Sequence, residues 1–129
     1  MSLSIGKHIR QVLSTSLKDE VGERLYPIST VKDTDFPFVV YDRSAIRTEY
    51  TKDGCASDTV TVTVYVLTEN YSEGVAIAEK VRDSLEGVSK TYDNFAVDDC
   101  SLTGADEAFN NNTFIQALTF NFETRLIYK

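Results

Sequence analysis

Residues 59–67 read Thr-Val-Thr-Val-Thr-Val-Tyr-Val-Leu, and this stretch decides the fold. Valines alternate with other side chains at a period of two, which is the period of a β-strand. β-branched residues also favour an extended backbone. The pattern predicts a strand with its valine face in the core. The opposite face carries Thr59, Thr61, Thr63, Tyr65 and Leu67.

The segment before this strand predicts its partner in a β-hairpin. Phe38-Val39-Val40-Tyr41 opens a second extended run, which continues to about Tyr50. Asp53-Gly54 lies between the two runs, and glycine tolerates the positive φ that a tight reversal requires.

Two stretches have the three- and four-residue apolar spacing of amphipathic helices. The first runs from Leu3 to Leu17, with Ser2 or Ser4 as its N-cap. Its apolar stripe consists of Ile5, Ile9, Val12, Leu13 and Leu17. The second begins at Asn70 or Ser72 and ends at Gly87, with Glu73 in its first turn. Its stripe consists of Ala78, Val81 and Leu85, flanked by Val75 and Ile77.

The C-terminal part predicts two further strands. The first is weak and is marked by Phe95, Val97 and Leu102. The last is long and carries on one face Phe114, Leu118, Phe120, Phe122, Leu126 and Tyr128. Residues 104–112 between them (Gly-Ala-Asp-Glu-Ala-Phe-Asn-Asn-Asn) are polar, and we expect a mobile loop there.

These elements predict an α+β fold in a single domain over residues 1–129. We expect about four mostly antiparallel strands with two helices packed on one face, because this arrangement buries every apolar stripe. The connection over residues 18–37 is polar and contains only a short extended piece around Leu25–Ile28. No repeat or linker marks a domain boundary.

Composition and charge exclude several classes of partner. The chain has 13 basic and 20 acidic side chains and a net charge of −7. This balance argues against binding a phosphate backbone or an anionic membrane surface. We expect no signal peptide and no membrane segment. Cys55 and Cys100 are therefore expected to be free thiols in a protein made in a reducing cytoplasm.

The sequence offers no catalytic, cofactor or metal constellation. His8 is the only histidine, and we expect it on the polar side of the first helix. Cys55 has no identifiable catalytic partner. Neighbouring strand residues such as Asp98 and Asp99 are expected on opposite faces, where they cannot share an ion. Such acidic pairs are best interpreted as solvated surface.

The aromatic residues indicate a contact surface. Seven Tyr and seven Phe exceed what a small sheet covered on one face can hide, and Tyr suits half-buried protein contacts. We predict a subunit interface formed by Tyr65, Thr61, Thr63, Leu67 and the hairpin residues Thr51 and Lys52.

Several segments together resemble a known family. They are Arg24-Leu25-Tyr26-Pro27, Phe36-Pro37-Phe38-Val39-Val40-Tyr41, the 60–66 strand, the helix ending in Leu85-Glu86-Gly87, and the final aromatic strand. In this order they resemble the phage tail-completion and head–tail joining proteins over nearly the full length. The family's Tyr-Pro and Pro-Phe positions correspond to Tyr26, Pro27, Pro37 and Phe38, which we interpret as fold-determining.

The resemblance implies a virion structural protein without enzymatic activity, made in the bacterial cytoplasm. Its copies would form a ring, expected to be a hexamer, between the head connector and the tail tube. DNA would pass through without specific binding, and Asp106 and Glu107 are our candidates for a loop lining the channel. Two alternatives stay open: a ligand- or peptide-binding module using the tyrosine-bearing sheet face, and a small enzyme using Asp98, Asp99 or the loop acids.

Overall fold

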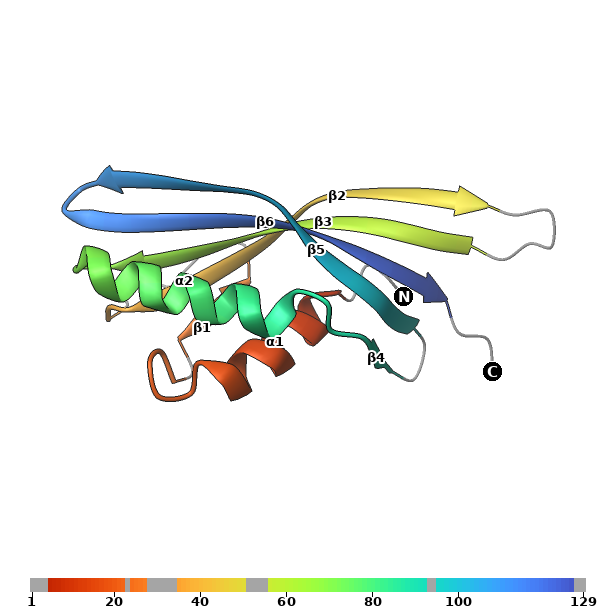
Figure 1. Cartoon of the computed structure of the whole chain (residues 1–129), viewed down its shortest axis with the longest axis horizontal. Helices are drawn as coiled ribbons and strands as arrows, with labels where there is room; N and C mark the ends of the chain where they lie inside the picture. Colours follow the sequence, from red (N-terminus) through yellow and green to blue (C-terminus); the bar gives the residue numbers. More distant parts are fainter. Residues whose placement is uncertain (1–4, 23, 28–34, 51–55, 93–94, 127–129) are drawn as a thin grey trace.

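The computed structural model describes residues 5–22, 24–27, 35–50, 56–92 and 95–126. The elements lie in the order α1 (Ile5–Ser16), β1 (Leu25–Pro27), β2 (Phe38–Tyr50), β3 (Ala56–Thr68), α2 (Tyr71–Leu85), β4 (Lys90–Thr91), β5 (Phe95–Asn110) and β6 (Thr113–Leu126). Figure 1 shows a long twisted sheet with both helices on one side of it.

The sheet has six strands in the order β1-β2-β3-β6-β5-β4. The expectation of about four strands was too low, because β1 and β4 have only three and two residues. The four long strands are antiparallel to their neighbours, while β1 pairs with β2 in parallel. The predicted β2–β3 hairpin is confirmed by its pairing from Phe38 to Tyr50. Its predicted turn at Asp53-Gly54 lies outside the described residues.

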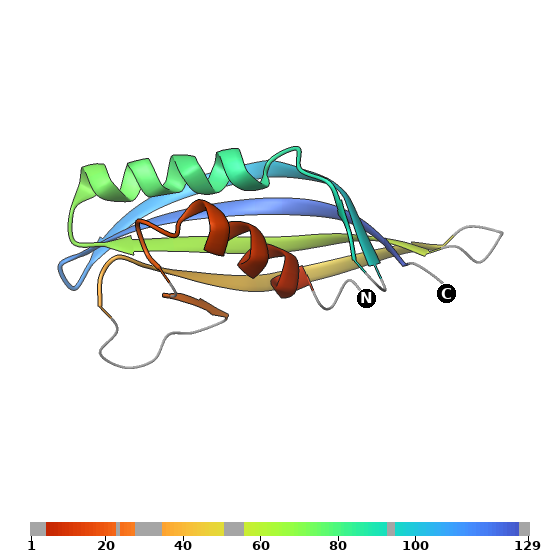
Figure 2. The same cartoon turned by 90° about the horizontal axis from the view of Figure 1, so that it is seen from below.

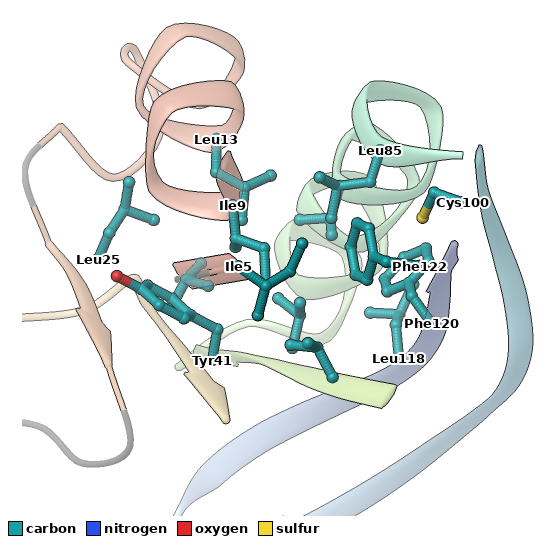
Figure 3. Packing of buried hydrophobic residues seen from close by; sticks show 14 of the residues in the cluster. Ile5, Ile9, Leu13, Leu25, Tyr41, Leu85, Cys100, Leu118, Phe120 and Phe122 are labelled. Atoms are coloured by element: carbon teal, nitrogen blue, oxygen red, sulfur yellow. The ribbon is translucent and has the colours of Figure 1, made fainter. Parts of the chain in front are cut away.

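The core lies between the helices and the valine face of β3, as the alternation predicts. Val60, Val62, Val64 and Val66 are all 0% exposed. Figure 3 shows Ile5, Ile9 and Leu13 of α1 beside Leu85 of α2, with Phe120 and Phe122 of β6 below. Leu17, Val21 and Leu25 extend the same core along the connection after α1. The α+β fold with its helices on one sheet face is therefore confirmed.

Helix α2 begins and ends as its sequence predicts. The Asn70 side chain accepts a hydrogen bond from the Glu73 backbone N–H at 3.1 Å, which satisfies one free donor of the first turn. After the last turn, Gly87 has a φ of +76°, a conformation that glycine adopts without steric cost.

Residues 104–112 do not form the predicted loop. β5 continues through Gly104 to Asn110, and β6 begins at Thr113. The reversal takes only Asn111 and Asn112, with φ values of 51° and 61°. A two-residue hairpin turn of this kind needs positive φ at both positions, and Asn tolerates it. The sequence suggested a loop because this part of β5 is exposed on both faces and has no apolar alternation.

Candidate interaction surfaces

The sheet face opposite the helices is the main candidate site. Within the described part of the chain, no helix or strand packs over it, as the two views in Figures 1 and 2 agree. Directly paired residues point to the same face, so the pairing assigns the members of this face. We call it the open face; its central members are Thr59, Thr61, Thr63, Tyr65 and Leu67 of β3 and Ile115, Ala117, Thr119, Asn121 and Glu123 of β6.

One half of the open face is polar and internally hydrogen-bonded. The Thr61 hydroxyl donates to the Asn121 side-chain oxygen at 2.8 Å, and the Thr63 and Thr119 hydroxyls are 3.3 Å apart. The Thr59 hydroxyl donates to the Glu123 carboxylate at 3.2 Å. These cross-strand bonds satisfy the polar groups locally and leave a polar surface.

The other half of the open face is apolar. Tyr65 lies opposite Ala117, and Leu67 lies opposite Ile115. On β2, Phe38 and Val40 pair with Leu67 and Tyr65 on the same face, but both are buried, with 5% and 8% of their surface exposed. No described helix or strand covers this apolar half. Its members are half-buried by their neighbours and keep part of their surface exposed: Tyr65, Leu67, Ile115 and Ala117. The structure thus brings four predicted interface residues, Tyr65, Thr61, Thr63 and Leu67, onto one surface. Thr51 and Lys52 lie outside the described residues.

The predicted channel residues Asp106 and Glu107 lie in strand β5 and not in a loop. As strand neighbours they point to opposite faces of the sheet. Asp106 pairs with Ala117 and belongs to the open face. Glu107 pairs with Gln116 on the helix side, and the Gln116 side-chain amide donates to it at 2.9 Å. Hydrogen bonds from Tyr71 and then Gln116 lower the pKa of Glu107.

An exposed aromatic cluster at the tip of the β5–β6 hairpin was not predicted. Phe109 is 60% exposed and Tyr71 is 48% exposed. Both rings contact Phe114, with centroid distances of 4.7 Å and 5.7 Å. Phe109 and Phe114 meet only through the hairpin register, and Tyr71 joins them from the start of α2. No sequence spacing shows this contact once residues 104–112 are interpreted as a loop.

His8 is buried, which corrects the prediction that it lies on the polar side of the helix. It is 0% exposed, and its Nδ1 is hydrogen-bonded to the Tyr92 hydroxyl at 2.6 Å. Its ring also meets the edge of Phe122. Burial and then the charge of Lys90 lower the pKa of His8 to about 4, so the imidazole is neutral at pH 7. The signal was present in the sequence, because His8 follows Ile5 by three residues and belongs to the apolar stripe.

The other titratable candidates do not converge on a reactive centre. Cys100 is buried and unpaired; burial and then the charges of Asp99 and Glu86 raise the pKa of its thiol to about 12. Cys55 lies outside the described residues.

Asp98 and Asp99 lie at a register shift of the β5–β6 ladder between Val97 and Asp99, which interrupts the regular pairing, and both residues are exposed. Asp98 forms an ion pair with Arg125 at 3.1 Å. Among the described residues, no three His, Cys, Asp or Glu side chains are grouped to hold a metal ion.

The hollows of the described surface are either small or lined by polar groups that are already hydrogen-bonded to one another. One of about 200 Å³ lies between α1 and β2 and is lined by Ile5, Ile9, Pro27 and Tyr41. Another of about 480 Å³ lies over the polar half of the open face, where Thr59, Thr61, Asn121 and Glu123 bond one another. No helix in the described ranges is long and apolar enough to span a membrane.

Comparison with known proteins agrees with this architecture. The family model described as "Tail completion protein gp17" matches residues 5–127. No curated protein matches the chain. A chain from a structure described as "Virion of native gene transfer agent (GTA) particle" matches with a TM-score of 0.79 and 16% identity, and the match covers 91% of each chain. At this identity the likeness shows a shared fold.

Proposed function

Since the chain belongs to the tail completion protein gp17 family and is a structural subunit of a phage-type head–tail apparatus, we propose that it works as one unit of a ring between the head connector and the tail tube. The ring is a hexamer in this proposal. The subunit is made in the bacterial cytoplasm and becomes part of the virion. It has no catalytic activity of its own.

The observation that carries the proposal is the uncovered apolar half of the open face. Tyr65, Leu67 and Ile115 form a continuous patch on a sheet whose other face already holds the core. Burying apolar surface stabilises an assembly by roughly 25 cal/mol per Å². A chain that functions alone gains nothing from leaving this patch in water. We assign the patch, with Thr61 and Thr63 beside it, to contacts with neighbouring subunits of the junction.

The acidic charge supports passage of DNA without retention. Repeating a chain with a net charge of −7 around a ring gives a strongly negative object. Binding to the duplex requires basic side chains that displace counterions from phosphates, and here 20 acidic side chains outnumber 13 basic ones. Asp106 is our candidate for the channel wall because its side chain lies on the open face. Glu107 is the weaker candidate, since Tyr71 and Gln116 hold its carboxylate on the helix side.

The two alternative functions find less support. Ligand pockets typically enclose roughly 300–1,000 Å³ and bring a few polar groups together. The hollow of about 200 Å³ beside α1 is smaller, and the hollow of about 480 Å³ is lined by polar groups that are already paired. An enzyme would need an accessible nucleophile or base, and the thiol of Cys100 and the imidazole of His8 are both buried.

Deleting the gene from the phage or prophage tests the proposal. We expect free heads and free tails by electron microscopy, and restored joining when the wild-type gene is supplied in trans. Joined, infectious particles without the protein would overturn the proposal. Quantifying the protein in purified particles gives its copy number, which we expect to be six per head–tail junction.

A further inference from the structure

The two long edges of the sheet are only partly covered. On the β5 edge, β4 pairs with Ala96 and Val97. The end of α2 then covers two more positions: the Gly87 N–H donates to the Cys100 carbonyl at 2.8 Å, and the Leu102 N–H donates to the Glu86 carboxylate at 3.1 Å. Beyond Leu102, the outer edge of β5 has no strand beside it in the described part of the chain.

The pairing shows which backbone groups are left on this edge. Residues that flank a two-residue hairpin turn bond to each other, so Asn110 and Thr113 face inward. Inward and outward positions alternate along an antiparallel strand. The N–H and C=O groups of Phe109, Glu107 and Ala105 therefore point outward. Such a row is a template for another strand.

The β2 edge is open in the same way at the other end of the sheet. β1 pairs only with Val39–Tyr41, and the Val39 N–H donates to the Arg24 carbonyl at 3.0 Å. From Ala45 to Tyr50 the outer side of β2 has no strand beside it among the described residues. Continuing the alternation past the register shift at Arg43/Ala45 leaves the backbone groups of Ile46 and Thr48 pointing outward. Figure 2 shows this part of β2 extending past the helices.

We infer that residues 103–110 of β5 in one copy pair antiparallel with residues 45–50 of β2 in the next copy, so that one sheet runs through neighbouring subunits. This inference rests on the proposed ring and names the contact that closes it. β2 and β5 run in opposite directions within a chain, because three antiparallel pairings separate them. A copy placed beside the first in the same orientation therefore presents its β2 antiparallel to β5, with the strands tilted from the ring axis.

Side chains on both faces of the joined sheet are complementary. On the open face, β5 carries Asp106 and β2 carries Arg47, whose side chain is 79% exposed and forms an ion pair with Glu49 of its own strand at 2.8 Å. In the joined sheet Asp106 adds a second carboxylate to this guanidinium. On the helix face, a hollow of about 180 Å³ between α2 and β5 is lined by Val75, Leu102, Ala105 and Leu118 among others. Ile46 lies on the helix face of β2, since it pairs with the buried Val60, and it is half-buried against the core of its own chain. Its exposed part suits the apolar side of that hollow, whose lining also includes Glu79, Arg82 and Gln116.

The positions of the free edges favour a ring over a two-fold dimer. The free part of β2 lies at the end of the sheet where β5 is covered, and the free part of β5 lies at the end where β1 covers β2. Pairing two different edges is a head-to-tail contact, which closes into a ring when the rotation allows it. It also shifts each copy along the strand direction, and closed sheets require such a stagger.

Site-directed cross-linking tests this contact. Ala45 and Ala108 are exposed, lie on the open face of the two edges, and change little in size when replaced by cysteine. We would prepare Ala45→Cys and Ala108→Cys separately in a Cys55→Ser background; Cys100 stays, because its thiol is buried. The two proteins are assembled together into particles and treated with a short bis-maleimide. Ala76→Cys, on the exposed side of α2, replaces Ala108→Cys in the control mixture.

We expect a covalent dimer from Ala45→Cys mixed with Ala108→Cys, and at least ten-fold less from either variant alone or from the control mixture. An Ala108–Ala108 dimer would overturn the inference by showing a two-fold contact. Variants that enter particles and join heads to tails without any cross-link would overturn it as well, while leaving the ring function intact. A wild-type protein absent from particles would contradict both the proposed function and this contact.

Discussion

The Tyr92 hydroxyl lies 2.6 Å from Nδ1 of His8, a residue 84 positions earlier in the chain. This bond joins α1 to the segment after β4. The His8 ring also makes a T-shaped contact with the ring of Phe122. The imidazole of His8 is buried, and its Nε2 has no hydrogen-bond partner among the described residues. Protonating this ring in the folded protein is therefore unfavourable. The stability of the fold should therefore depend on pH through His8.

His8 should destabilise the protein as the pH falls from about 6.5 to about 4. The folded-state pKa is lower than the unfolded one, so the unfolded chain binds the extra proton in this window and stability rises with pH. Over this window the lowered pKa of His8 reduces the free energy of unfolding by an amount on the order of 3 kcal/mol. We expect the loss of unfolding free energy between pH 7 and pH 5 to be smaller in His8→Gln than in wild type, as measured by urea denaturation. Equal losses in both proteins would contradict the assignment.

Cys100 should resist modification in the folded protein. Its thiol is buried and its pKa is raised to about 12, so almost no thiolate exists at pH 8. In Cys55→Ser we expect no reaction with a thiol reagent until denaturant is added, and then one group per chain. The unreduced, denatured wild type should titrate two groups. A wild-type titre near zero would reveal a disulfide and refute the prediction of free thiols.

Leu85→Ala should lower the free energy of unfolding by roughly 2–5 kcal/mol, because Leu85 of α2 is 0% exposed and packs in the core with residues of α1 and β6. Val75→Ala on the same helix is the matched control; Val75 is only half-buried and should cost clearly less. Chemical denaturation of the purified variants measures both. Similar losses would mean that α2 does not pack through the face assigned to it.

Asn112→Gly should stabilise the β5–β6 hairpin by up to about 1 kcal/mol. Asn112 has a φ of 61°, where glycine avoids the steric cost of a side chain and suits the second position of such a turn. Thr113→Gly, one residue later in β6, should instead destabilise the protein, since glycine weakens strands. A lower melting temperature for Asn112→Gly would argue against the turn.

The sequence predicted those elements whose pattern comes from burial on one face. The valine alternation located β3, and the apolar spacing with Asn70 and Gly87 located α2, because each signal reflects contact with a single core. The outer half of β5 was missed for the converse reason. Residues 104–110 are exposed on both faces, so their side chains carry no period. The backbone ladder to β6 holds them in a strand, together with side-chain contacts such as Phe109–Phe114.

The candidate surface was predicted in part for similar reasons. Thr61, Thr63, Tyr65 and Leu67 share a face because strand geometry alone requires it. Asp106 and Glu107 could not be separated onto two faces while their segment was interpreted as a loop. The cluster of Tyr71, Phe109 and Phe114 depends on the hairpin register and on where α2 begins. Local sequence composition predicts neither of these.

The most direct test of the central claim is Tyr65→Glu, measured by counting joined particles in the electron microscope after complementation of the gene deletion. Tyr65 lies in the apolar half of the open face and is not part of the core cluster, so the purified variant should keep the wild-type melting temperature within a few degrees. We expect heads and tails to remain separate, whereas Ala76→Glu on the exposed side of α2 should join them normally. Normal joining by a folded Tyr65→Glu protein would contradict the assignment of the open face to assembly, and an unfolded monomer would show that Tyr65 serves the core.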